Sequence, residues 1–138
     1  MSERSSHAIV LPYALPCASL VYRIIPAQAN LIRPDGTPDP ALFYRKIRDR
    51  DGVSVATTVE AGLERFRNVG RPVEGALSLH VGWVRDIEPF GRLDVRSKHA
   101  ESTHAAITGL PYEDDDLREA EKLANELLKL ARRVPLPE

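Results

Sequence analysis

The chain has 138 residues, 19 of them basic and 20 acidic, and a formal net charge of −1 at pH 7. This length suits one domain with its own hydrophobic core, and the even charge balance disfavours a protein devoted to nucleic acid or to anionic membranes. Cys17 is the single cysteine. It excludes an intramolecular disulfide and predicts a small packed side chain in a cytoplasmic protein.

Residues 1–17 form the first recognisable segment, a polar start followed by apolar residues that Pro12 and Pro16 interrupt. A signal peptide has a basic start and a longer apolar run, and a membrane span needs roughly 18 apolar residues. We therefore interpret 1–17 as an N-terminal arm, extended or partly disordered, which docks on the body or on a partner protein. Residues 18–138 then form a single domain, and no membrane contact is expected.

The next segment, residues 20–25, is β-branched and aromatic and predicts a strand. Arg23 is its one charge, and on an alternating strand it shares a face with Val21 and Ile25. Residues 26–40 hold four prolines and a turn signal at 34–36, which predicts a long surface loop. Loops of this length are often functional.

Residues 41–48 fit either a helical turn or the edge of a strand, and residues 53–56 predict a second strand. The first clear helix is expected over 57–69, because Thr57 and Glu60 have the spacing of a capping box. Gly70 and Pro72 then end it.

Three further strands are expected, over 75–84, 92–96 and 103–108, because apolar and polar residues alternate in each. In the first of them, alternation predicts that Val81 and Trp83 share the core face. A final helix of about 18 residues is expected after Asp116, with an apolar stripe that runs on to Val134. The order of elements predicts an α+β domain, with a mostly antiparallel sheet and two helices packed on one face.

Several polar residues could carry chemistry, but each also has an ordinary structural explanation. His80 follows Ser78 on a strand face and is either functional or solvated. His99 and His104 lie five residues apart, a spacing that matches no strong metal motif, so no metal site is predicted. The basic stretch 45–50 could contact nucleic acid, but its interruption by aspartates favours a solvated charged edge.

Two segments together resemble a known family. A strand with a lone arginine at 20–23 is followed by a strand-to-helix segment at 52–64. This is similar to the start of small ADP-ribosyltransferase-like domains, especially the RES-type toxins that degrade NAD. The resemblance implies that Arg23 grips the dinucleotide and that Glu64 is catalytic, with His80 and His104 as auxiliary groups. Ser54 stands where the family has an aromatic residue.

The chain departs from the family pattern, because the Arg-aromatic-Asn segment before the second strand is missing. Residues 104–111 are also similar to a stretch of short bacterial proteins of comparable length, and that resemblance implies no activity. Two hypotheses follow. The favoured one is a non-catalytic protein-interaction module without a cofactor, which holds a partner protein through the arm and the loop 26–40. The alternative is an ADP-ribosyltransferase-like enzyme or toxin with NAD as its cofactor.

Overall fold

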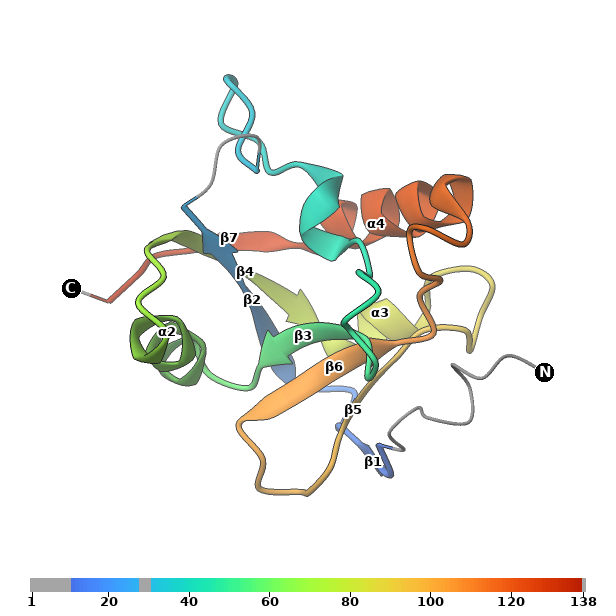
Figure 1. Ribbon diagram of the computed structural model, residues 1–138. Helices are drawn as coiled ribbons and strands as arrows, with labels where there is room; N and C mark the ends of the chain where they lie inside the picture. Colours follow the sequence, from blue (N-terminus) through green and yellow to red (C-terminus); the bar gives the residue numbers. More distant parts are fainter. Residues whose placement is uncertain (1–10, 28–30, 138) are drawn as a thin grey trace.

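A sheet of seven strands organises the part of the chain that the computed structural model describes, residues 11–27 and 31–137 (Figure 1). The strand order is β1-β5-β6-β3-β2-β4-β7, and every neighbouring pair is antiparallel. The strands are β1 (Tyr13–Ala14), β2 (Leu20–Pro26), β3 (Val53–Ala56), β4 (Val73–His80), β5 (Asp94–Ser97), β6 (His104–Thr108) and β7 (Arg132–Val134). The helical elements are η1 (Pro40–Phe43), α2 (Val59–Asn68), α3 (Val81–Arg85) and α4 (Leu117–Leu130). This confirms the predicted α+β class with a mostly antiparallel sheet.

One face of the sheet carries the hydrophobic core. Alternate residues of the central strands, such as Val21 and Ile25 of β2, are fully buried there. The apolar stripe of α4 closes this core with Leu123, Ala124 and Leu127. The confirmed alternation and stripe therefore place α4 over the face that includes Val21.

The opposite face of β2 receives α2, so the two long helices lie on different faces of this strand (Figure 1). Gly62 of α2 comes so close to the sheet that an added Cβ would lie 2.7 Å from the Ile24 side chain and 3.3 Å from Ala56. Ile24 and Ala56 alternate away from the core residues. The two helices that the sequence analysis expected on one face therefore lie on opposite faces.

Two elements end earlier than the sequence predicts. The strand expected over 75–84 ends at His80, because its partner β2 begins at Leu20, opposite His80. The chain continues as the short helix α3, which leaves Trp83 46% exposed. The last helix ends at Leu130, and the following residues form β7. This strand pairs with β4, whose edge would otherwise be open.

The start of α2 also shifts by one residue. The N-cap is Thr58, whose Oγ1 accepts a hydrogen bond from the Ala61 amide. Thr57 still belongs to the sheet side of the junction, since its amide donates to the carbonyl of Thr103. By contrast, Asp116 caps α4 as predicted and accepts from the amide of Glu119.

The described part of the predicted arm lies along the body. Tyr13 and Ala14 form the edge strand β1 on β5, and Leu15 belongs to the hydrophobic core. Arg96 donates hydrogen bonds to the carbonyls of Leu11 and Pro12. Residues 1–10 lie outside the described residues. In the described segments, no helix is long and apolar enough to cross a membrane.

Candidate functional site

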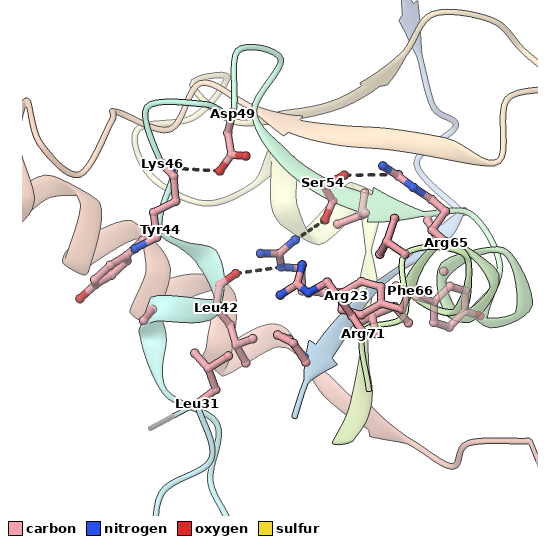
Figure 2. Close-up of a pocket in the computed structure, with 18 of the residues that line it drawn as sticks. Arg23, Leu31, Leu42, Tyr44, Lys46, Asp49, Ser54, Arg65, Phe66 and Arg71 are labelled. Carbon is pink, nitrogen blue, oxygen red and sulfur yellow. Dashed lines mark hydrogen bonds between the residues drawn. The ribbon is translucent and has the colours of Figure 1, made fainter. Parts of the chain in front are cut away.

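A cavity among the described residues opens where β2 and β3 separate. The register joins these strands at one pair, Tyr22 with Ala56, whereas β2 and β4 pair along their length. Beyond Tyr22 the two strands diverge, and α2 and the segment after η1 flank the gap (Figure 2). The resulting cavity has a volume of about 490 Å³, within the range usual for small-molecule sites.

The cavity wall is strongly basic. Of its charged side chains one is acidic, Asp49, and five are basic: Arg23, Lys46, Arg48, Arg65 and Arg71. The whole chain carries a net charge of −1, so this concentration of positive charge is local. Three aromatic residues also line the cavity: Tyr22, Tyr44 and Phe66.

Arg23 occupies the opening between the two strands. Its Nε donates to the carbonyl of Leu42 at 2.8 Å and its Nη1 donates to the carbonyl of Ser54 at 2.8 Å (Figure 2). These bonds hold the guanidinium in place and satisfy two carbonyls that have no ladder partner there. Nη2 donates to no group in the described part of the chain, so it is available to a bound molecule.

The charge of Arg23 is poorly compensated by the protein. Burial lowers its pKa to about 10, and the positive charge of Arg71 adds to this effect while the negative charge of Asp49 opposes it. Arg23 still carries its proton at neutral pH. No carboxylate of the described residues forms an ion pair with it, so a bound anion would supply the missing countercharge.

The other basic groups differ in how far they are already engaged. Lys46 pairs with Glu113 at 3.0 Å. Arg71 lies over the ring of Phe66, 4.9 Å from its centroid. Arg65 approaches Ser54 Oγ with its Nη1 at 3.5 Å, a long contact (Figure 2). Within the described segments, Arg65 and Arg71 form no ion pair with a carboxylate, so both are free to meet an anion.

Ser54, which lines this cavity, also contacts His104. Ser54 Oγ lies 2.5 Å from Nε2 of His104, across the β3–β6 pair. Burial lowers the pKa of His104, and Arg65 and Lys98 lower it further while Asp51 opposes them. The imidazole is therefore neutral at pH 7. His104 itself lines a smaller cavity of about 190 Å³.

The structure brings together three of the five predicted site residues, Arg23, Ser54 and His104. Among the described residues, Glu64 and His80 line neither cavity. Glu64 is exposed on α2. His80 stacks on Trp83 with ring centroids 4.8 Å apart, and its Nδ1 is buried with no hydrogen-bond partner in the described part of the chain.

The sequence interpretation missed most of the basic wall. Arg48 is exposed, as expected for a solvated edge, but both Lys46 and Arg48 also line the cavity. Arg45 of the same stretch turns inward and donates to the carbonyls of Asp49, Arg50 and Leu110. Arg65 follows Glu64 directly, and only the direction in which α2 docks decides which of the two faces the cavity.

The described residues contain no group of three or more His, Cys, Asp or Glu side chains that could hold a metal ion. Asp94, near His99 in the sequence, forms ion pairs with Arg85 at 2.6 Å and with Arg96 at 2.9 Å.

Comparisons of the chain with protein-family models, with curated proteins and with solved structures found no match. What the domain binds is therefore inferred from the chemistry of the cavity.

Proposed function

We propose that this domain binds a small phosphate-bearing anion of the nucleotide class in the cavity between β2, β3 and α2. The observation that supports this is the cavity wall, in which five basic side chains face one acidic side chain. Guanidinium groups present paired donors that match the oxygens of a phosphate. A cavity of about 490 Å³ has room for a nucleotide-sized molecule.

Arg23 is the central phosphate ligand in this proposal. Its guanidinium is oriented by two carbonyls and keeps Nη2 free of described partners, so little side-chain entropy is lost when an anion binds. Arg65 and Arg71 extend the positive surface along α2 and the residues after it. The aromatic ring of Tyr44 offers an apolar surface for a base or another flat group.

The resemblance to ADP-ribosyltransferase-like domains agrees with the role of Arg23 and makes NAD one of the nucleotides to test. It assigns catalysis to Glu64, however, and Glu64 is exposed on α2 outside the wall of the cavity. We therefore restrict the proposal to binding. The expected cytoplasmic location suits such a ligand, because nucleotides are abundant there.

Isothermal titration with ADP, with inorganic pyrophosphate and with adenosine tests the proposal. We expect ADP and pyrophosphate to bind and adenosine to bind much more weakly, and the affinity for ADP to fall as salt is added. Arg71→Ala should weaken ADP binding by about tenfold, the value of one charged contact. Arg118→Ala is the matched control, because Arg118 is exposed on α4 and lies outside the cavity wall. Equal binding of adenosine and ADP contradicts the proposal.

A protein-interaction module is the second candidate, and one surface favours it. Leu20 is 45% exposed and lies opposite His80 in the β2–β4 register, and Trp83 stacks on His80. Exposed aromatic groups of this kind are common at protein interfaces. Trp83 is the only tryptophan, so its emission can follow titration with the products of neighbouring genes. Emission that changes with none of them contradicts this candidate.

A further inference from the structure

The wall of the cavity contains a hydroxyl group held against an imidazole. Ser54 Oγ lies 2.5 Å from His104 Nε2, while Ser54 also lines the large cavity. The hydroxyl is thus placed between a base and the space that a ligand would fill. We propose that Ser54 is a nucleophile, activated by His104, that accepts the acyl group of an ester whose molecule also carries an anionic group.

Both residues owe their positions to the β3–β6 register. Ser54 is paired with Ala106 and Ala56 is paired with His104, so Ser54 and His104 are diagonal neighbours on one face of the sheet. The backbone around Ser54 is fixed further, because Arg23 donates to its carbonyl. A nucleophile and base held on two rigid strands meet the geometric requirement for such a pair.

The protonation state of His104 fits the role of a base. Its pKa lies below the ordinary value because the ring is buried and faces the charges of Arg65 and Lys98, so the imidazole is neutral at pH 7. Nε2 can accept the serine proton when the ring carries its own proton on Nδ1. Asp51 lines the same small cavity as His104, and its negative charge favours the protonated imidazole that forms when Nε2 accepts this proton.

Arg65 is placed to stabilise the charge that develops in the reaction. Its Nη1 lies 3.5 Å from Ser54 Oγ, close to where the oxygen of an attacked carbonyl would be. A second arginine of the wall, Arg71, can hold the anionic group of the same molecule. Uncharged esters would lack this second contact.

Hydrolysis of the ester needs only these side chains and one water molecule. Ser54 Oγ forms a bond to the carbonyl carbon, and its proton passes to His104 Nε2. The carbon–oxygen bond to the alcohol part then breaks, and His104 returns the proton to the leaving oxygen. Water repeats the sequence on the acyl-serine, which releases the acid and restores the hydroxyl of Ser54.

Labelling of the full chain with phenylmethylsulfonyl fluoride tests the proposal, since this uncharged reagent sulfonylates activated serines with loss of fluoride. We expect one sulfonyl group per chain by intact mass, located on Ser54 by peptide mapping. His104→Gln should slow the labelling by about 100-fold, the lower end of the contribution of a general base. Ser78→Ala is the matched control and should label at the wild-type rate, because the hydroxyl of Ser78 bonds to the carbonyl of Arg132.

Two results would overturn the proposal. One is labelling of Ser54 in the folded protein that is no faster than in the urea-unfolded chain. The other is an unchanged rate in a folded His104→Gln variant, with folding checked by its far-ultraviolet circular dichroism. The reagent carries no charge, so labelling does not require anion binding. Failure here is therefore distinguishable from failure of ADP to bind in the cavity.

Discussion

Replacing Arg23 by methionine separates the structural role of this residue from its role in binding. The change removes the guanidinium but keeps an unbranched apolar chain between β2 and β3. Two hydrogen bonds are lost, to the carbonyls of Leu42 and Ser54. Hydrogen bonds from a charged donor contribute about 1.5–3 kcal/mol each, so together roughly 3–6 kcal/mol.

The burial of the charge works in the opposite direction. Burial lowers the pKa of Arg23 to about 10, which corresponds to a cost of roughly 3 kcal/mol, because each pKa unit is worth about 1.4 kcal/mol. Methionine removes that cost. We therefore expect Arg23→Met to destabilise the fold by about 0–3 kcal/mol, measured by urea unfolding followed by circular dichroism.

Arg23→Met should also weaken the binding of ADP. Losing one charged contact to phosphate lowers the affinity for ADP by about 10- to 100-fold in isothermal titration. Arg23→Lys keeps a positive charge without the paired donors of the guanidinium, so its affinity for ADP should lie between those of the wild type and of Arg23→Met. Full ADP affinity in a folded Arg23→Met variant would refute the assignment of Arg23 as the central phosphate ligand.

Three further predictions concern stability and pH. Leu127→Ala should cost about 2–5 kcal/mol in urea unfolding because Leu127 is fully buried, whereas Leu117→Ala, at a position 51% exposed, should change stability by less than about 0.5 kcal/mol; equal effects would contradict the packing of α4. Thr58→Ala should lower the free energy of unfolding by about 1 kcal/mol through loss of the N-cap, and Thr57→Ala should lower it by less. A larger loss for Thr57→Ala than for Thr58→Ala would place the cap at Thr57. The pKa of His104 is lowered in the folded state, so the stability that it contributes is complete above about pH 6.5 and is lost as the pH falls through the lowered pKa. His104→Gln should therefore reduce the loss of unfolding free energy over that acidic range. An unchanged dependence of the unfolding free energy on pH would show that His104 is not the group responsible.

Much of the fold could be predicted because it is encoded in local periodicity. The β-branched and aromatic run at 20–25 predicted β2, the alternation at 103–108 predicted β6, and the apolar stripe after Asp116 predicted α4. Asp116 caps that helix as expected, since a cap depends on residues within one turn. The strand that was expected to reach Val84 stops at His80, because the length of its partner decides where pairing ends.

The candidate site was predictable only in part, for a related reason. Arg23 stood out in the sequence, because a charge in an apolar strand needs a compensating partner. Nothing local indicated that Arg65, Arg71 and Lys46 would face the same space. Those residues are separated along the chain, and their meeting depends on where β2 and β3 diverge and on how α2 docks.

The class of the domain, the apolar faces of its main elements and the unusual arginine could all be predicted from the order of residues, since each follows from the chemistry of neighbouring residues. Three features became visible in the folded chain alone: α2 and α4 cover opposite faces of β2, the last residues add a strand to β4, and Ser54 lies against His104. These contacts join residues that are distant in sequence. Their geometry is fixed by packing of the whole core and by pairing of the strands, which no short pattern encodes.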